Sequence, residues 1–509
     1  MNKYIVIGLI CLTCLLTACG YTDYLREYRQ NVSGSAVSGG GIYSMRRATK
    51  KPEITPDVVS GAAVSGSGIH SADNVTAFMQ TADYWIGKTV QPDKILMSDE
   101  EIKSFNKKMT EQLAGNKNVE YYNLAAYGDS MDDEQLSAML SKADFSNGNY
   151  YAFDVPVTEE KWTAYYENQN EKAISNFNTI RYGVICSRAD VRALPTADYV
   201  TDNQGDKGHD ILQYTALAVN EPVLVLHTSK DGEWFFVMAN EYAGWVKKET
   251  VGLCRDKAEW NRAQEMKRFL VVTGDTVRLE ENPYNVSTSQ CEFTMGTRLA
   301  LAEEGEYPAV IDSRNVYDNY VIKVPVRKEN GMLSYEIAMM PLGKDVKEGY
   351  LEYTRANVLR LAFKMLGNLY GWGGMYNARD CSSMTRDIYL CFGFRLPRDS
   401  SAQALIPGEG RMDISKLSDK EKTQKMYSVQ PGTILQMPGH VMIYLGCESH
   451  NYYVISANGS FVPDSVKGDM NLAKGNYTTR TVTVNDLNVK SPGNGKTWLS
   501  QLATIVGIP

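Results

Sequence analysis

The chain has 509 residues, of which 43% are hydrophobic, and a formal net charge of −7. This length predicts three or four domains with ordinary hydrophobic cores. The slightly acidic balance gives no indication of nucleic-acid binding or of attraction to an anionic membrane surface.

The N-terminal residues are typical of an export signal. Lys3 supplies a positive charge, and residues 4–16 form an apolar run that is too short for a transmembrane helix. The run leads through Thr17 and Ala18 to Cys19, which resembles the signal of bacterial lipoproteins. That resemblance implies removal of residues 1–18 and a lipid on Cys19, which would hold an extracytoplasmic protein on a bacterial membrane. The alternative is an ordinary secretory signal with a coincidental cysteine.

Two segments without candidate chemistry follow. Residues 19–70 are rich in Gly, Ser and Ala and predict a flexible tether, because this composition buries too little surface to offset the entropy of ordering. Residues 71–175 show helical periodicity, and Ser98 with Glu101 predicts a capping box at the start of one helix. We interpret them as a supporting domain.

The spacing of apolar residues along the sequence then shortens to the alternation that is typical of β-strands. Within residues 176–258, strands are expected at 222–227 and 233–237 around an Asp-Gly turn, and Gly244-Trp245-Val246 follows. This pattern resembles a bacterial SH3-like barrel, in which His227 would lie in the wall. Residues 259–345 predict a second SH3-like barrel, from short apolar stretches separated by turn residues.

The candidate catalytic residues lie in the last segment, residues 346–509. Thr354 is expected to cap a helix, and a glycine-rich loop at 370–374 precedes Cys381. Apolar residues recur after Cys381 at helical spacing, so Cys381 should open a second helix, within which Cys391 is a buried structural residue. The unpaired N–H groups at a helix start favour a thiolate over a thiol.

A histidine is available as the partner of this cysteine. His440 begins an apolar strand after Gly439, whereas His450 falls in a polar turn. A general base must lie within hydrogen-bond reach of its nucleophile, and the start of a strand can present a base to the end of a helix. No set of His, Asp and Glu residues has the spacing of zinc ligands, so we expect neither a metal nor a cofactor.

Four motifs resemble those of the NlpC family of cell-wall cysteine peptidases over about residues 350–480: Tyr370-Gly371-Trp372-Gly373-Gly374, Asp380-Cys381-Ser382, Leu396-Pro397-Arg398 and Gly439-His440-Val441. The resemblance implies an α+β multidomain chain that ends in a papain-like domain, in which a helix with the cysteine packs on an antiparallel sheet with the histidine. It also implies a substrate, the bond between D-glutamate and a diamino acid (diaminopimelate or lysine) in peptidoglycan stem peptides.

The same resemblance implies roles for single residues. Cys381 would attack the carbonyl, and His440 would take the thiol proton and later give it to the leaving amine. Tyr370 matches a tyrosine that helps to stabilise the oxyanion. Asp380 and Ser382 match positions that contact the free amino end of the substrate in some members.

In those members the first barrel walls the site, and residues near Arg192 or Asp210 are the candidates for this purpose here. The chain departs from the family motifs at two positions. Ser383 replaces a glycine, and the third catalytic residue, usually histidine, falls at Ser456. The serine hydroxyl could orient the imidazole, and Asn458, on the same face of the strand, is the alternative third residue.

Three functions remain open. The first is the peptidase. The second is a wall-binding or scaffolding lipoprotein that has lost the chemistry, which the substituted third residue and the two barrels favour. The third is an amidase or acyltransferase on the same fold, because one thiolate–imidazole pair can serve any acyl transfer.

Overall fold

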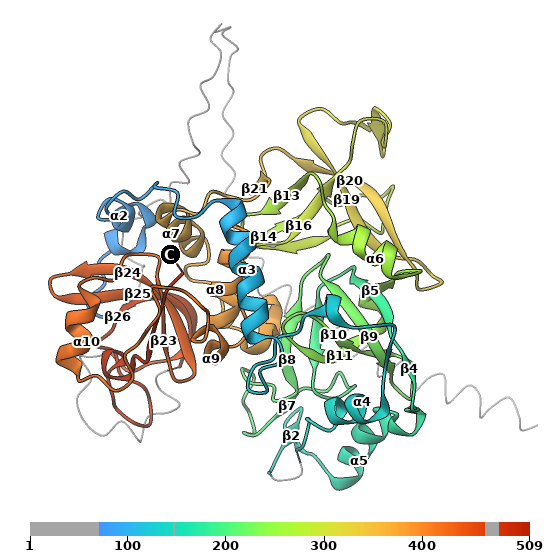
Figure 1. Cartoon of the computed structure of the whole chain (residues 1–509), viewed down its shortest axis with the longest axis horizontal. Coiled ribbons are helices and arrows are strands. Elements are labelled where there is room, and N and C mark those ends of the chain that lie inside the picture. Colours follow the sequence, from blue (N-terminus) through green and yellow to red (C-terminus); the bar gives the residue numbers. More distant parts are fainter. Residues whose placement is uncertain (1–70, 146–147, 464–477, 509) are drawn as a thin grey trace, which may run out of the picture. The chain divides into compact units, whose positions relative to one another are not determined.

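The computed structural model describes residues 71–145, 148–463 and 478–508 (Figure 1). The predicted signal peptide, lipid attachment at Cys19 and tether lie outside the described residues. Within the described part, no helix combines the length and apolar character that a membrane span requires. Helices alternate with antiparallel sheets, which confirms the predicted α+β multidomain class.

The N-terminal helical segment begins with the predicted cap. In the capping box, the Ser98 hydroxyl accepts the Glu101 N–H, and the Glu101 carboxylate accepts the Ser98 N–H at 2.7 Å. The helices and short strands of this region are α2 (Ala82–Ile86), α3 (Asp99–Leu113), α4 (Asp133–Leu140), α5 (Glu159–Asn168), β1 (Ser130–Met131), β2 (Tyr151–Ala152), β3 (Val155–Pro156) and β4 (Asn178–Thr179).

This segment is divided among three hydrophobic cores, one of which contains Ala152 of β2 and Tyr165 of α5. Trp85 of α2 and Met109 of α3 pack into the core of the C-terminal domain, whereas Leu136 and Leu140 of α4 pack against the first barrel. The structure therefore differs from the single supporting domain predicted for residues 71–175. Helices this short gain most of their stability by burying an apolar stripe, and each buries it against the nearest sheet.

The first barrel is a seven-stranded antiparallel sheet with the strand order β12-β5-β9-β10-β11-β6-β8. The predicted hairpin is present as β9 and β10, and Trp245 is fully buried. His227 lies in β9, where its ring hydrogen-bonds the Asn170 carbonyl at 3.1 Å, which confirms its predicted place in the wall. The strands of this region are β5 (Arg181–Ile185), β6 (Ala189–Arg192), β7 (Val200–Thr201), β8 (Gln213–Leu217), β9 (Pro222–Thr228), β10 (Trp234–Met238), β11 (Ala243–Lys247) and β12 (Val251–Leu253).

A second β-rich module follows helix α6 (Lys257–Gln264), where the second barrel was predicted. Its main antiparallel sheet has the order β20-β19-β16-β13-β21, and Leu270, Leu299 and Ile322 are fully buried in its core. The strands are β13 (Phe269–Val272), β14 (Thr276–Arg278), β15 (Glu292–Thr294), β16 (Arg298–Leu301), β17 (Val310–Ile311), β18 (Arg314–Asn315), β19 (Asn319–Arg327), β20 (Leu333–Pro341) and β21 (Val346–Glu348).

The C-terminal domain packs helices on a six-stranded antiparallel sheet with the order β22-β27-β23-β24-β25-β26 (Figure 1). Thr354 caps the first helix, as predicted, by accepting the Asn357 N–H. Helix α8 contacts β24 and β25, which brings the candidate nucleophile to the sheet. The elements are α7 (Arg355–Phe363), α8 (Cys381–Leu390), α9 (Ser400–Gln403), α10 (Asp419–Met426), α11 (Trp498–Gln501), β22 (Met412–Asp413), β23 (Ile434–Met437), β24 (His440–Glu448), β25 (Asn451–Ser460), β26 (Thr478–Asp486) and β27 (Thr504–Val506).

Candidate active site

Cys381 is the first residue of helix α8. Asp380 caps the helix by accepting the Ser383 N–H at 2.9 Å, and the Ser383 hydroxyl accepts the Asp380 N–H at 3.0 Å. The Ser383 that replaces the family glycine therefore completes a capping box. The predicted helix start is confirmed, and the Cys381 side chain is buried there.

The sulfur of Cys381 lies beside the start of β24. The N–H groups of Val441 and Ser382 reach it and lower its pKa, but burial has the larger effect, and together with the Asp380 charge it raises the pKa of Cys381 to about 12. Val441 directly follows His440, so the fold brings the two predicted catalytic residues to one place. At rest the sulfur is a thiol, because burial outweighs the effect of the helix start.

His440 is held by a hydrogen-bonded chain along β25. Its Nε2 lies 3.0 Å from the Ser456 hydroxyl, which donates to the Asn458 side-chain oxygen at 3.1 Å. A hydroxyl has one proton, so Ser456 must accept the Nε2–H of the imidazole. This arrangement leaves Nδ1 unprotonated and available as the base. Ser456 orients the ring, and Asn458 orients Ser456.

The contribution of Ser456 can be measured by deleting its hydroxyl. In Ser456→Ala we expect kcat to fall about tenfold with little change in KM, because the imidazole loses the acceptor that fixes its tautomer. Ser460→Ala, on an exposed position of the same strand, is the matched control and should leave kcat unchanged. An unchanged kcat in Ser456→Ala would show that the hydroxyl does not orient the ring.

Trp498 covers the imidazole from the C-terminal segment. The two ring centroids are 4.9 Å apart, and Trp498 is almost fully buried. Sequence reasoning missed this residue, since nothing in the pattern of α11 connects it to a strand almost sixty residues earlier. Burial in this environment lowers the pKa of His440 to about 4, against a smaller opposing effect of Asp380. The resting pair is therefore a neutral thiol and a neutral imidazole.

The pH dependence of the reaction should report this lowered value. The imidazole can accept the thiol proton only when neutral, so kcat/KM should stay level through neutral pH and fall only as His440 becomes protonated, near its pKa of about 4. Trp498→Ala, which opens the ring to water, should move this acid limb toward the ordinary value of about 6.5. Initial rates with a stem peptide between about pH 3 and pH 8 test both expectations. A wild-type limb at about 6.5 would contradict them.

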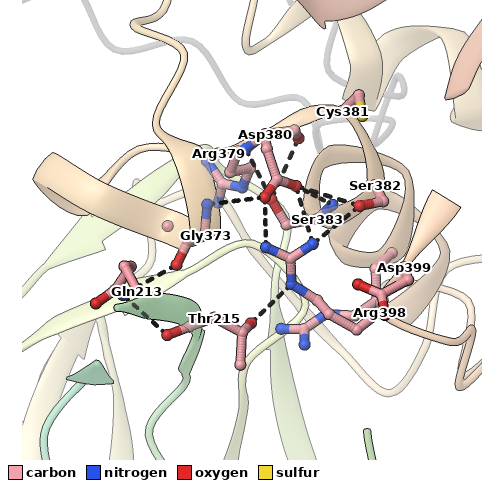
Figure 2. Close-up of polar contacts among 12 residues, drawn as sticks. Gln213, Thr215, Gly373, Arg379, Asp380, Cys381, Ser382, Ser383, Arg398 and Asp399 are labelled. Carbon is pink, nitrogen blue, oxygen red and sulfur yellow. Dashed lines mark hydrogen bonds and ion pairs between the residues drawn. The ribbon is translucent and has the colours of Figure 1, made fainter. Parts of the chain in front are cut away.

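Asp380 and Ser382 are engaged in a buried network with Arg398 (Figure 2). The guanidinium donates to both carboxylate oxygens of Asp380, at 3.0 and 2.5 Å, and to the Ser382 hydroxyl at 2.9 Å. The Gly373 N–H donates to the same carboxylate at 3.1 Å. Burial alone would raise the pKa of Asp380, but Arg398 holds it below its ordinary value.

This network bears on the expectation that Asp380 and Ser382 contact the free amino end of the substrate. In the structure both oxygens of the Asp380 carboxylate already accept several hydrogen bonds, and both side chains are almost fully buried. Their observed role is to fix the start of α8 and the glycine-rich loop. Contact of these two residues with a substrate amine stays a prediction.

The first barrel packs against the glycine-rich loop. Gln213 donates from its side chain to the Gly373 carbonyl at 3.0 Å (Figure 2). Gly373 has a φ of +56°, and an added Cβ would lie 2.8 Å from the Gln213 carbonyl oxygen, so this contact requires glycine. Arg192 forms a buried ion pair with Asp210 at 2.9 Å. Arg192 and Asp210, near which we expected a wall of the site, therefore pair with each other, and Arg192 also donates to the Gln213 side chain at 3.3 Å.

Two buried arginines connect helix α8 to both β-rich modules. Arg379, directly before the helix cap, pairs with Asp275 of the second module and with Asp387 at 2.7 Å. Arg386, within α8, pairs with Glu241 of the first barrel at 2.5 Å. Sequence reasoning missed both arginines, because the partners Asp275 and Glu241 lie about 100 or more residues away.

Tyr370 lies next to this site in the glycine-rich loop. Its N–H donates to the Arg480 carbonyl of β26 at 2.9 Å. Burial raises the pKa of its phenol well above the ordinary value, and the charges of Asp380 and Cys381 act in the same direction. The hydroxyl therefore stays protonated at neutral pH, as a donor to a developing oxyanion must.

Comparison with known proteins agrees with this architecture. Residues 201–247 match the SH3 domain of the SH3b1 type, and residues 367–487 match the NlpC/P60 family. The structure resembles that of an NlpC/P60 endopeptidase from Photobacterium damselae subsp. piscicida, with 18% identity, a TM-score of 0.63, and coverage of 86% of this chain and 98% of the other. An NlpC/P60 family protein from Bacillus cereus ATCC 10987 also matches, at 17% identity and a TM-score of 0.41, over 64% and 98% of the two chains. No curated protein matches the sequence significantly.

The match to the NlpC/P60 family includes Tyr370, Cys381, His440 and Ser456 but ends before Trp498. The likeness to the Photobacterium structure is a likeness of fold. The domain matches and the fold support a cell-wall peptidase of the cysteine type. The residues that match the family motifs also lie together in the structure, at the start of helix α8. The chain thus carries a bacterial SH3 domain followed by an NlpC/P60 domain.

Proposed function

We propose that the chain is a cysteine endopeptidase that cuts peptidoglycan stem peptides between γ-linked D-glutamate and the diamino acid. One observation carries the proposal: the Cys381 sulfur lies at the opening of α8 beside β24, where Ser456 orients His440 as a base. The match of residues 367–487 to the NlpC/P60 family supports the substrate class.

The resting thiol and imidazole are both neutral, so catalysis begins with a proton transfer. Nδ1 of His440 takes the thiol proton while the sulfur forms a bond to the scissile carbonyl carbon. The carbonyl electron pair moves to oxygen, where the Cys381 N–H and the Tyr370 hydroxyl can donate. The C–N bond then breaks, and the imidazolium protonates the leaving amine. Water, deprotonated by His440, hydrolyses the thioester and restores the thiol.

Incubation with defined substrates tests the proposal. Peptides of the form L-Ala-γ-D-Glu-diamino acid and intact sacculi are supplied to the full chain, and products are identified by mass spectrometry. We expect one cut, which releases a fragment that begins with the diamino acid. Binding to sacculi without any cleavage would favour the scaffold function, and release of ammonia or acyl transfer to an amine would favour the amidase or acyltransferase.

We further propose that a lipid on Cys19 anchors the protein outside the cytoplasm. The apolar run that leads to Cys19 supports this proposal. Cells grown with a labelled fatty acid should yield a labelled protein in the membrane fraction. Cys19→Ala should lose the label and leave that fraction. A labelled Cys19→Ala variant would refute lipid attachment at this residue.

A further inference from the structure

Arg480 of β26 places a cation beside the candidate active site. Its carbonyl accepts the Tyr370 N–H at 2.9 Å, and the neighbouring residues Leu369 and Thr481 form an isolated β-bridge. The chain around Tyr370 is therefore fixed to β26 at this point. This hydrogen bond places the backbone of Arg480 against the loop residue that carries the candidate oxyanion donor, the Tyr370 hydroxyl.

The first barrel holds the Arg480 side chain from the other side. One guanidinium nitrogen, Nη2, donates to the Asp206 carboxylate at 2.6 Å. Gly208 packs against the guanidinium so closely that an added Cβ would lie 2.0–2.5 Å from its atoms. The side chain keeps 38% of its surface exposed, and among the described residues Nε and Nη1 have no hydrogen-bond acceptor. Arg480 is thus positioned by its neighbours and retains donors for a ligand.

The backbone at Arg480 is held in an uncommon conformation. Its φ is +45°, in the left-handed region that side chains other than glycine rarely adopt. The pairing of β25 with β26 shifts register between Asn458 and Ser460, opposite this part of β26. Such irregularities redirect a side chain, and strained residues of this kind concentrate at binding and active sites. The backbone strain and the ion pair with Asp206 independently indicate that the fold holds the guanidinium in a fixed position.

We propose that Arg480 binds the free α-carboxylate of the γ-linked D-glutamyl residue and so selects substrates in which this group is not amidated. The inference rests on the proposed function, because a γ-linked glutamyl residue keeps its α-carboxylate close to the scissile carbonyl. An arginine with free N–H groups suits a carboxylate, since charge-assisted hydrogen bonds fit its planar fork. Two other arginines nearby, Arg398 and Arg379, are already paired with buried aspartates.

Two peptides that differ in one group test the proposal with the full chain. Both are L-Ala-γ-D-Glu-diamino acid peptides, and one carries a carboxamide in place of the α-carboxylate. We expect the wild type to prefer the carboxylate peptide about tenfold in kcat/KM, as suits a charge-assisted hydrogen bond at a partly exposed site. Arg480→Gln should lose this preference by slowing the carboxylate peptide only. Arg480→Lys should keep part of it.

Lys207→Gln is the matched control. Lys207 lies in the barrel loop between Asp206 and Gly208, which hold Arg480. Its ammonium pairs with Asp154 instead, so the preference for the carboxylate peptide should remain. Cleavage of both peptides by the wild type at equal rates would overturn the inference. So would an equal loss on both peptides in Arg480→Gln, because a purely structural role has that effect.

Binding to a Cys381→Ala background separates this inference from the proposed function. Calorimetry should show tighter binding of the carboxylate peptide, and the added Arg480→Gln change should remove the difference. If the wild type cleaves neither peptide but this difference in binding is present, the carboxylate site stands and the peptidase proposal fails. Equal binding of the two peptides by the Cys381→Ala chain would overturn the carboxylate site.

Discussion

Cys381→Ala is expected to lower kcat on stem peptides by about 10⁴-fold or more, because no other group can form the thioester. Binding should change little, since the substituted side chain is small and buried. Single-turnover measurements with product detection by mass spectrometry give the rate. Calorimetry on the same samples shows whether the substrate still binds.

The matched control is Cys391→Ala, at the C-terminal cap of α8, the end opposite to Cys381. Cys391 is fully buried, and its sulfur lies 3.4 Å from the Val272 carbonyl of β13. This variant should keep wild-type kcat and lose only stability. Turnover in Cys381→Ala comparable to the wild type would remove the peptidase proposal, whatever the behaviour of Cys391→Ala.

Arg398→Leu should lower the free energy of unfolding by about 3–5 kcal/mol, because it leaves the Asp380 carboxylate buried without its counter-ion. Urea titration followed by fluorescence measures this loss. Arg268→Leu is the control, since it removes an exposed ion pair with Glu348 and should cost less than about 1 kcal/mol. Similar losses in the two variants would mean that the buried ion pair contributes no more to the free energy of unfolding than the exposed one.

The acid dependence of stability gives a second measure of the same pair. The folded pKa of Asp380 lies below its unfolded value of about 3.8, mainly because Arg398 opposes the effect of burial. Its contribution is therefore complete above the unfolded pKa and is lost as the pH falls through the folded pKa. Arg398→Leu should lack this part of the acid unfolding profile. An unchanged profile below about pH 4 would contradict the assignment.

The local features of this fold were predictable because their causes lie close together in the sequence. A cap needs only a residue and the N–H groups that follow it, so Ser98 and Thr354 could be identified directly. The β9–β10 hairpin follows from an Asp-Gly turn between two apolar runs. Cys381 at a helix start and His440 at a strand start follow in the same way from spacing.

Features that depend on burial or on distant partners were not predictable. The motif around Cys381 suggested a thiolate at a helix start, but the structure buries the sulfur and raises its pKa. The sequence also did not indicate that the Arg398 guanidinium donates to both carboxylate oxygens of Asp380, because nothing in the motif connects these two residues. Trp498 reaches His440 from the end of the chain, and no local pattern marks that contact.

The ion pairs of Arg379 and Arg386 have a consequence for protein engineering. A fragment limited to residues 346–509 would retain both guanidinium groups but would lack Asp275 and Glu241, which neutralise them from the two β-rich modules. Asp387 would remain in the fragment and contacts both arginines, so the excised domain would carry two guanidinium groups against one carboxylate on the helix that begins with Cys381. Attempts to recombine this domain with other targeting modules should supply equivalent carboxylates on the new partner, or replace one of the two arginines by a neutral side chain and leave the other paired with Asp387.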